Sequence, residues 1–576
     1  RRALAVSTTL VVILAALAIS TGTTNGDGGF AGILGVLRRE ELDLRGVGLT
    51  VAIAASAFAA LSVFEGMPRA VLALAAVLPL SLTVLASGRG LETRSVALAI
   101  ERGAPLGGPA LSLLRRLTDR DHDGASPRFG GGDCNDRDAH VFPGADDVPG
   151  NGIDEDCSGK DDALAPAPQA APRAAGSVNG AEWVREHFPA GLDVVFITVD
   201  TLRADLGFAG NPRPLSPNID ALAKKSTVFD RAYSLASYTG KSMGPMLLGK
   251  YPSETIRTFE HFDRFGPEET FVQERLQAAG LRTLTAQGHW YFEPTGLGRG
   301  FDDADFSAAP RVPQAEGDRT VNGDVLTDRA IGLLGKSENV SRPFYLWLHY
   351  VDPHAAYVPH PEFDFGTKSR DLYDGEVAFV DKQIGRLTAA IFGSPVASRT
   401  AIVLTSDHGE AFGEHGILRH GHEVWEELVH VPLIVYVPGV QPRHVSVRRS
   451  AIDVTPTLLE LQGAPIPSVT SSPGNTRDFV SGRSLLTDVV SPPDQTSEQR
   501  PVLVDMSEGP YNDERQAYFD GSLKLIATNG KPLGLYDLDR DPGETRDLLG
   551  DASIAEPIVA RFKAFRRTLR TVPAKR

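Results

Sequence analysis

The segment DVVFITVD, residues 193–200, decides the fold, because it is a short apolar run that ends on an acidic residue. A run of this length between turn signals is typical of a buried strand. Three further segments share its character: FYLWLHYV at 344–351, AIVLTSD at 401–407 and PLIVYVP at 432–438. Because such strands alternate with helical stretches, the sequence predicts an α/β domain with a mixed, mainly parallel sheet flanked by helices.

The remaining periodic segments complete this domain. Helical spacing is clearest at residues 373–391, where Val377, Val380, Ile384 and Leu387 recur on one face. Near the C-terminus, GSLKLIAT at 521–528 and LGLYDLDRDPGE at 533–544 predict a small antiparallel sheet. We place this α/β domain at residues 186–576.

Polar residues mark the C-terminal ends of the apolar segments, the edge where open α/β sheets bind ligands. Carboxylates and imidazoles from separate strands predict a divalent cation. Asp200 alone has a structural alternative, because it is also placed to cap the helix that follows. The polar residues are Asp200, His349, Asp352, His354, Asp407 and His408.

Ordered blocks across residues 190–550 resemble the sulfatase family of the alkaline phosphatase superfamily. The two longest are FITVDTLRADLG at 196–207 and TSDHGEAFGEHGILRHGHEVWEELVHVPLIVYVPG at 405–439. Shorter blocks occur in the family's order: SPNIDALAKKSTVFDRAYS, LLGKYPSE, GLGRGFDD, LHYVDPHAAYVPH, YDGEVAFVD and LYDLDRDPGETRDL. The resemblance implies a sulfatase-like fold in which one metal activates a nucleophile and binds a sulfate or phosphate group.

The family's site residues carry over position by position. Asp200, Asp407 and His408 fall where the family holds its metal. The family nucleophile lies ten residues before the Gly of a G-[RK]-Y-P block, here residues 249–252, and this spacing identifies Thr239 as nucleophile and fourth metal ligand. The start of the helix that follows favours anionic oxygens there.

Five further residues are candidates for catalytic roles. His354 resembles a substrate-contacting histidine of the family, and either His420 or His422 is placed to protonate the leaving oxygen. For His422 a structural role is the alternative. His289 stands where family members often carry Lys or His, and Lys241 lies beside the proposed nucleophile.

Thr239 departs from the pattern of dedicated sulfatases. These carry Cys or Ser followed by Pro and Arg, so that the side chain is oxidised to formylglycine, whereas residues 239–243 read TGKSM. Threonine cannot become formylglycine, but it is the nucleophile of the related lipid phosphoethanolamine and phosphoglycerol transferases. The Asp407–His408 pair also resembles that group, and Thr201 replaces an acidic metal ligand of sulfatases. These departures favour phosphoryl transfer and suit Mn or Zn at least as well as Ca.

Residues 119–162 form an acidic module, with 13 Asp or Glu against four Lys or Arg. It resembles small Cys-paired metal-binding repeats of bacterial surface proteins, and spaced Asp, Asn and Gly residues suit calcium. A disulfide between Cys134 and Cys157 is the simplest interpretation if the segment is exported. A solvated acidic linker is the alternative. The candidate ligands are Asp119, Asp121, Asp123, Asp133, Asn135, Asp136, Asp154 and Asp156.

The N-terminal region predicts a membrane anchor. Uncharged apolar runs at 4–20, 47–64 and 70–86 are close to the length of a membrane span, although the first alone also fits a signal peptide. Residues 1–90 are therefore expected to hold about three transmembrane helices. Residues 91–118 are a connector, and 163–185 are a Pro/Ala linker. The catalytic domain is expected on the outer, periplasmic or extracellular side of the cell membrane.

Three functions remain open at this point. The first is a membrane-anchored hydrolase or transferase that acts on phospho- or sulfo-esters, of a lipid or a polysaccharide among others, through a covalent Thr239 intermediate. The second is a true sulfatase, and the third is a catalytically silent, calcium-dependent surface binding protein. A formal net charge of −15 argues against a nucleic-acid partner.

Overall fold

The structure, a computed structural model, describes most of the chain beyond residue 106. The described residues are 107–143, 145, 151–157, 159, 179–309, 322–467, 478–493, 495–510 and 512–575. The chain divides into two compact units, residues 1–168 and 169–576, and this boundary falls inside the predicted 163–185 linker. The three predicted membrane spans lie outside the described residues. Within the described ranges, none of the helices has both the length and the apolar character that a membrane span requires.

The catalytic unit is built around an eight-stranded sheet in the order β12-β2-β11-β7-β1-β6-β4-β5. Strand β11 pairs antiparallel with β7 and β2, and the other pairs are parallel. The predicted mixed, mainly parallel sheet is therefore confirmed. The strands are β1 (Asp193–Val199), β2 (Thr227–Phe229), β4 (Arg282–Gln287), β5 (Asp303–Asp305), β6 (Phe344–Tyr350), β7 (Thr400–Ser406), β11 (Leu433–Tyr436) and β12 (Arg443–Val445).

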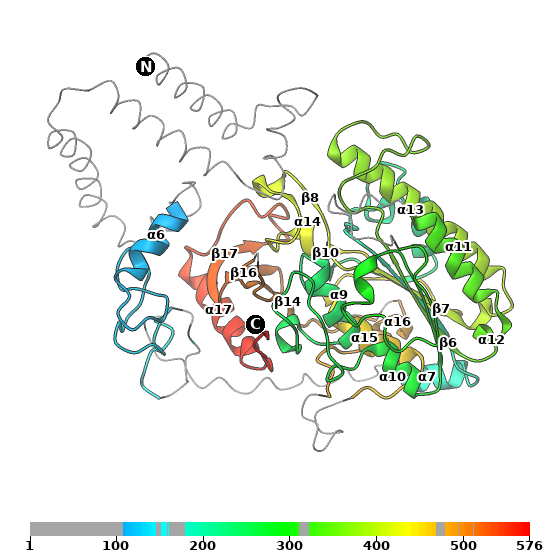
Figure 1. Ribbon diagram of the computed structural model, residues 1–576, viewed down its shortest axis with the longest axis horizontal. Coiled ribbons are helices and arrows are strands. Elements are labelled where there is room, and N and C mark those ends of the chain that lie inside the picture. The colour runs from blue at the N-terminus through cyan, green and yellow to red at the C-terminus, as the bar shows by residue number, and fades with distance from the viewer. Residues whose placement is uncertain are drawn as a thin grey trace, which may run out of the picture. The chain divides into compact units, whose positions relative to one another are not determined.

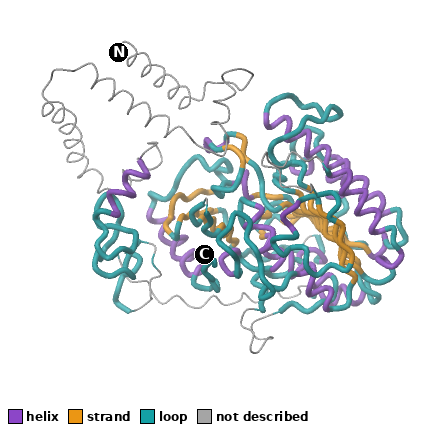
Figure 2. The backbone as a smooth tube through the Cα atoms, in the orientation of Figure 1, coloured by secondary structure: helices purple, strands orange, loops and turns teal. Residues whose placement is uncertain are grey.

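Helices cover both faces of this sheet, as Figures 1 and 2 show. The apolar residues of β1 alternate between the two sides: Phe196 packs in one core and Ile197 in the other. Helices α8 (Pro217–Ala223), α11 (Gly323–Leu334) and α13 (Ser369–Phe392) supply the core that contains Ile197. The other core is supplied by α7 (Gly180–His187), α9 (Thr239–Leu248), α10 (Val272–Ala278), α15 (Val454–Leu461), α16 (Leu486–Val490) and α17 (Ala552–Arg566). Burial on both faces explains why β1 is mostly apolar, with Val194–Ile197 in an unbroken run instead of alternating with polar residues.

The helices of the catalytic unit are α7 (Gly180–His187), α8 (Pro217–Ala223), α9 (Thr239–Leu248), α10 (Val272–Ala278), α11 (Gly323–Leu334), α12 (Ser337–Val340), α13 (Ser369–Phe392), α14 (Glu426–Val429), α15 (Val454–Leu461), α16 (Leu486–Val490) and α17 (Ala552–Arg566). The 3₁₀ helices are η1 (Gly207–Ala209), η2 (Pro252–Glu254), η3 (Trp290–Phe292), η4 (Ala397–Arg399), η5 (Glu414–Gly416) and η6 (Ala451–Asp453). The predicted helix at 373–391 begins four residues earlier, because the Asp371 carboxylate accepts the N–H of Lys368 and caps the first turn.

Smaller sheets complete the unit. The predicted C-terminal antiparallel sheet is confirmed with four strands, β14 (Val502–Met506), β15 (Arg515–Asp520), β16 (Leu523–Thr528) and β17 (Lys531–Asp537). A three-stranded sheet joins β3 (Ala232–Tyr233), β10 (His430–Val431) and β13 (Arg449–Ser450), and a hairpin joins β8 (Ala411–Phe412) and β9 (Leu418–Arg419). In the first unit, α6 (Gly107–Arg116) precedes the loops of the acidic module.

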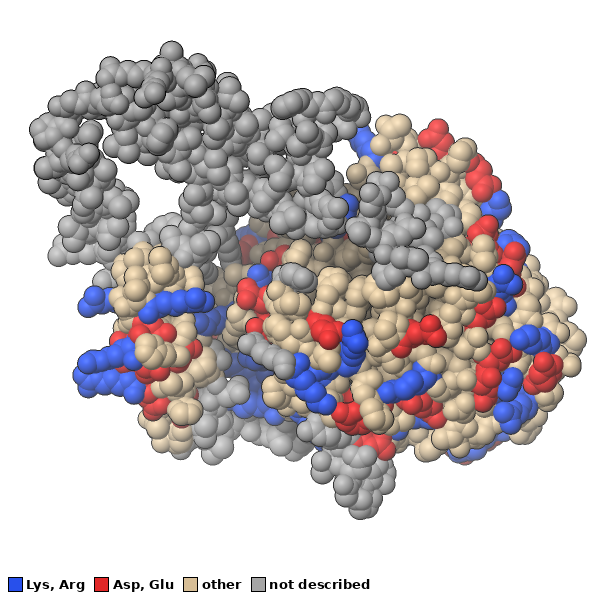
Figure 3. Space-filling model, in the orientation of Figure 1, with Lys and Arg blue, Asp and Glu red and all other residues tan. Residues whose placement is uncertain are grey.

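Acidic and basic side chains are interspersed over the visible face of the catalytic unit in Figure 3. Nucleic-acid binding domains instead gather Lys and Arg on one face. That the chain has no nucleic-acid partner stays a prediction.

Candidate active site

The ends of two neighbouring strands place acidic and imidazole groups at one edge of the central sheet. Asp200 directly follows β1, and Asp407 and His408 directly follow β7, which pairs with β1. One ligand atom from each of these three residues lies within 4.8 Å of the other two, and all three side chains are buried. The structure therefore brings together three of the four proposed metal ligands.

Thr239, the fourth, reaches this cluster from the first turn of α9. Its Oγ1 lies 2.9 Å from Nε2 of His408 and 3.5 Å from Oδ2 of Asp200. Tyr238 before it has an extended backbone, so Thr239 is the first residue of this buried, ten-residue helix. The N-terminus of a helix carries partial positive charge, which favours an anionic oxygen at this point.

The atoms that face one another in this cluster are hydrogen-bond acceptors. Oδ1 of Asp200 and Oδ2 of Asp407 are buried and accept no hydrogen bond from the described part of the chain. Nδ1 of His408 donates to the carbonyl oxygen of Gly409 over 2.9 Å, which leaves a lone pair at Nε2. Buried acceptors at this proximity are unfavourable unless a cation lies among them. The side chains present therefore fit a divalent cation.

The pKa values of the two carboxylates agree with this interpretation. Burial would raise the pKa of Asp200, but the hydrogen bond from His349 and the surrounding imidazoles hold that pKa below its usual range. Burial, followed by the negative charge of Asp200, raises the pKa of Asp407. One carboxylate thus has a lowered pKa and its neighbour a raised pKa, because the positive charge around the pair does not balance two negative charges. A bound cation would supply the missing positive charge.

Between the two candidates for leaving-group protonation, the structure brings His420 to the site. Nδ1 of His420 donates to the buried carboxylate of Glu410 over 2.9 Å, which orients the ring. The ring centroid of His420 lies 4.5 Å from that of His408 and 4.9 Å from that of His354. Burial lowers the pKa of His420, and the charge of Glu410 opposes this effect. His422 is exposed.

Lys241 is buried in an ion pair near the start of α9. Its Nζ lies 3.3 Å from Oδ2 of Asp263 and 3.3 Å from the carbonyl oxygen of Glu508. Burial lowers the pKa of Lys241 and raises the pKa of Asp263 to about 6, against the charges of Lys241 and Arg257. These contacts tie the helix that carries Thr239 to the segment after β14.

His289 occupies an aromatic group at residues 289–292. Its Nδ1 accepts the backbone N–H of Tyr291 over 3.3 Å, and the two ring centroids lie 4.6 Å apart. Among the described residues, no group of three or more His, Cys, Asp or Glu with ligand atoms within 4.8 Å of one another includes His289. Asp352, also marked by the sequence, accepts the backbone N–H groups of Asn322 and Gly323 and so supports the start of α11.

Sequence reasoning missed Glu410 and Asp263. Glu410 stands two positions beyond His408, so its place in the same turn was a usable signal. For Asp263 the sequence contains no comparable signal, because its partner Lys241 is 22 positions away in a separate element. His349 was marked as a polar residue of an apolar strand but given no role.

Comparison with known proteins identifies the domain that holds this cluster. Residues 193–464 match the sulfatase family model. The chain carries a sulfatase-family domain. Among curated relatives, human iduronate 2-sulfatase is 27% identical over 43% of this chain and 60% of its own length. The ulvan-active sulfatase of Formosa agariphila is 24% identical over 63% of this chain and 78% of its own length.

Solved structures share the sulfatase fold. A protein in complex with its substrate D-glucosamine-2-N,6-O-disulfate superposes with a TM-score of 0.54, at 19% identity, over 66% of this chain and 97% of its own. The phosphonate monoester hydrolase of Agrobacterium radiobacter superposes with a TM-score of 0.52, at 18% identity, over 66% of this chain and 96% of its own. At these identities the likeness concerns the fold.

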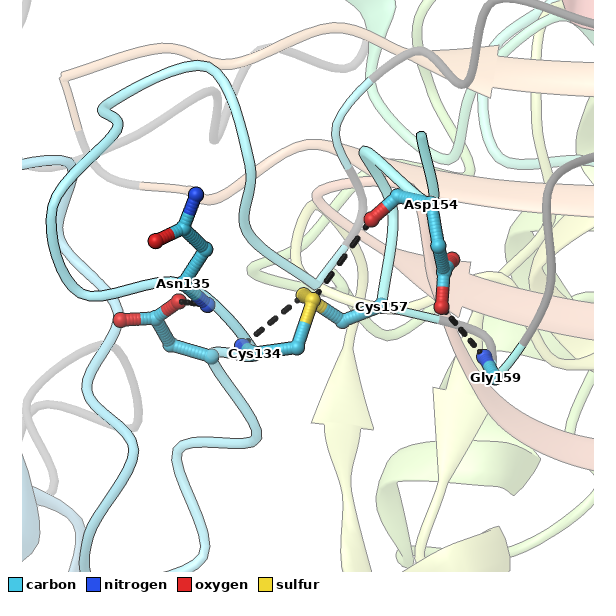
Figure 4. Close-up of a disulfide and its surroundings, with 6 residues drawn as sticks. Cys134, Asn135, Asp154, Cys157 and Gly159 are labelled. Carbon is cyan, nitrogen blue, oxygen red and sulfur yellow. Dashed lines mark hydrogen bonds between the residues drawn. A yellow bond between two sulfur atoms is a disulfide. The ribbon is translucent and has the colours of Figure 1, made fainter. Parts of the chain in front are cut away.

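Outside the sulfatase domain, residues 133–163 match a metal-binding motif model, which agrees with the predicted module. The predicted disulfide is confirmed: Cys134 and Cys157 are joined, with their Cα atoms 5.5 Å apart. Figure 4 shows Asp154 beside this bond, where its carboxylate accepts the N–H of Gly159 over 2.8 Å.

Three aspartates of the module lie close together. Ligand atoms of Asp119, Asp121 and Asp123 lie within 4.8 Å of one another. Burial, and then the nearby charges of Asp123, Asp121 and Asp136, raise the pKa of Asp133. Oδ2 of Asp121 and of Asp133 accept no hydrogen bond from the described residues. This group of carboxylate oxygens fits a hard cation such as calcium.

Removing one acid from the active-site cluster should remove one metal ion. We expect Asp407→Asn to reduce the Mn²⁺ bound per chain by one equivalent, because an amide lacks the charge that balances a cation in a buried site. Elemental analysis after dialysis measures the change. Asp381→Asn is the matched control, since the Asp381 carboxylate is buried on α13 but accepts backbone N–H groups of α8. Equal metal content in Asp407→Asn and the unmodified protein would contradict the assignment.

For the acidic module, Asp133→Asn should weaken calcium binding by about tenfold or more, because it removes a buried charge from an all-oxygen site. Equilibrium dialysis with ⁴⁵Ca²⁺ on protein preloaded with Mn²⁺ separates this site from the catalytic one. Asp138→Asn is the control, since Asp138 pairs with His140 at the surface. Unchanged calcium affinity in Asp133→Asn would reduce the module to an acidic linker.

Proposed function

We propose that the chain is a metal-dependent hydrolase of sulfate or phosphate esters in which the Thr239 hydroxyl attacks the sulfur or phosphorus. The observation that carries this proposal is the position of Thr239 Oγ1, 2.9 Å from Nε2 of His408 in a cluster that fits a cation. A bound divalent cation would lower the pKa of this hydroxyl and offset the charge of the ester oxygens. A serine or threonine without such help is a weak nucleophile at neutral pH.

The chain's own residues then divide the reaction into two steps. Thr239 Oγ1 loses its proton to solvent and forms a bond to sulfur or phosphorus, while the bond to the leaving oxygen breaks. That oxygen takes a proton from Nε2 of His420 in its doubly protonated, imidazolium form, whose Nδ1–H donates to Glu410, and the ring is left neutral. Water activated by the same Nε2 completes hydrolysis, and an alcohol in its place completes transfer.

The comparisons favour a sulfate ester as substrate. The curated relatives are named as sulfatases, and one solved neighbour holds a disulfated glucosamine. A phosphate ester is the second candidate, because Thr239 cannot form the formylglycine of dedicated sulfatases. The phosphonate monoester hydrolase among the structural neighbours shows that this fold also carries phosphorus chemistry.

We also propose that the domain works outside the cell membrane. The apolar runs at residues 4–20, 47–64 and 70–86 support an anchor. The Cys134–Cys157 disulfide supports an oxidising compartment such as the periplasm. Lipid and polysaccharide esters are the substrate classes that such a location offers.

Substitution of the nucleophile tests the proposed reaction. Thr239→Ala should lower kcat by about 10³-fold or more, whereas Thr239→Ser should retain part of the activity because it keeps the hydroxyl. The matched control is Ser237→Ala, since Ser237 lies two positions earlier and its Oγ contacts Met506 Sδ. Assays with sulfate, phosphomonoester and phosphodiester substrates, and mapping of a trapped sulfated or phosphorylated peptide, give the readout. Full activity in Thr239→Ala, or label on Ser242, would end the covalent-threonine mechanism.

Protonation of the leaving group separates His420 from His422. His420→Gln should lower kcat for alkyl esters by about 10²-fold or more, and far less for nitrophenyl esters, whose leaving oxygen needs no proton. The exposed His422→Gln should leave both unchanged. Equal losses on the two substrate types in His420→Gln would show that His420 acts otherwise than as an acid.

A further inference from the structure

The two oxygens of the Asp200 carboxylate have different surroundings. Oδ1 accepts no hydrogen bond from the described residues and lies 3.5 Å from Nε2 of His408. Oδ2 lies 3.4 Å from Nε2 of His349 and 3.5 Å from Oγ1 of Thr239. Oδ1 is therefore the oxygen open to a cation, and Oδ2 is the oxygen that neighbouring side chains hold.

His349 is fixed in the sheet beside this carboxylate. It lies on β6, opposite Thr198 of β1 in the parallel register, and is fully buried. Its Nδ1 lies 2.9 Å from Oγ1 of Thr198, and the indole N–H of Trp347 donates to the same oxygen over 3.1 Å. The imidazole also packs against Phe292, with ring centroids 5.2 Å apart. These contacts leave the ring one orientation, with Nε2 toward Asp200.

The donors and acceptors around the imidazole of His349 determine whether its Nε2 donates a hydrogen bond. Thr198 receives the indole N–H, and its one hydroxyl proton is shared between Nδ1 of His349 and the carbonyl oxygen of Leu348, 3.1 Å away. When Nδ1 accepts from Thr198, the N–H of the neutral ring lies on Nε2. That N–H meets Oδ2 of Asp200, so hydroxyl, imidazole and carboxylate form one chain of hydrogen bonds.

We propose that His349 is a positioning residue for the active-site cation, which donates from Nε2 to Oδ2 of Asp200 and so turns Oδ1 toward the cation. The proposal rests on the cation site of the proposed function. A separation of 3.4 Å is longer than the usual N–H···O distance of about 2.7–3.2 Å. The contact is therefore a weak hydrogen bond, and the role proposed for it is to orient the carboxylate. Hydrogen bonds of this kind to a metal-binding carboxylate typically govern metal affinity.

A role in packing alone explains the residue less well. Every residue of β6, Phe344–Tyr350, is buried, and an apolar side chain would fill this position without needing polar partners. A buried imidazole is instead unfavourable unless its nitrogens are paired. Here both nitrogens face polar partners, and one partner is the carboxylate of the candidate cation site.

Metal affinity of the full-length protein tests the proposal with Mn²⁺ as probe. His349→Leu should weaken Mn²⁺ binding about tenfold to hundredfold, as loss of such a bond to a metal ligand typically does. The thermal midpoint of the metal-free protein should not fall, because a packing residue is retained. His349→Gln, whose amide is able to donate to Oδ2, should bind within about threefold of the unmodified protein. Activity lost in His349→Leu should return in part at saturating Mn²⁺.

Two outcomes would overturn the inference: unchanged Mn²⁺ affinity in His349→Leu, or equal losses in the Leu and Gln variants together with a lower thermal midpoint of the metal-free protein. Asp407→Asn, measured alongside, keeps the proposed function separate. If that variant loses Mn²⁺ while His349→Leu does not, only the role of His349 fails. If Asp407→Asn binds Mn²⁺ as the unmodified protein does, the cation site itself is wrong.

Discussion

The approach of two buried carboxylates, Asp200 and Asp407, is the constraint on which the rest of the site depends. Strand pairing between β1 and β7 puts them there, because both residues directly follow strands that run side by side. Each has an oxygen that accepts no hydrogen bond within the described residues. Two buried carboxylates are unfavourable without positive charge nearby, and a divalent cation between them would supply that charge.

The same constraint explains how the surrounding groups are arranged. Helix α9 delivers Thr239 to the edge where the carboxylates meet, and the β8–β9 region delivers His420 with Glu410 as its partner. His349 approaches from β6, on the side of the carboxylate away from His408. The residues that hold a cation and those that would break an ester bond are thus supplied by separate elements around one sheet edge.

The sequence predicts the central sheet and most of the residues of the site, and the parts that it does not predict depend on contacts between distant segments. Apolar runs in the sequence predict buried strands such as residues 193–199. Because ligands bind at the C-terminal ends of parallel strands, the residues after these runs, Asp200 and Asp407, are predicted site residues. Spacing to the block at 249–252 was needed for Thr239, because a lone hydroxyl has no pattern of its own. The partners of buried ions, such as Asp263 for Lys241, join distant segments, and only the fold shows them. The choice of His420 over His422 likewise needed burial, since both histidines lie in one short segment.

Anomalous diffraction from crystals grown with Mn²⁺ tests the central claim most directly. The account predicts one strong peak in the sulfatase domain, with Asp200, Asp407, His408 and Thr239 atoms all at roughly 2.0–2.6 Å from it. A peak that lacks Thr239 Oγ1 among its neighbours, or a fully occupied Mn²⁺ elsewhere with this cluster empty, would contradict it.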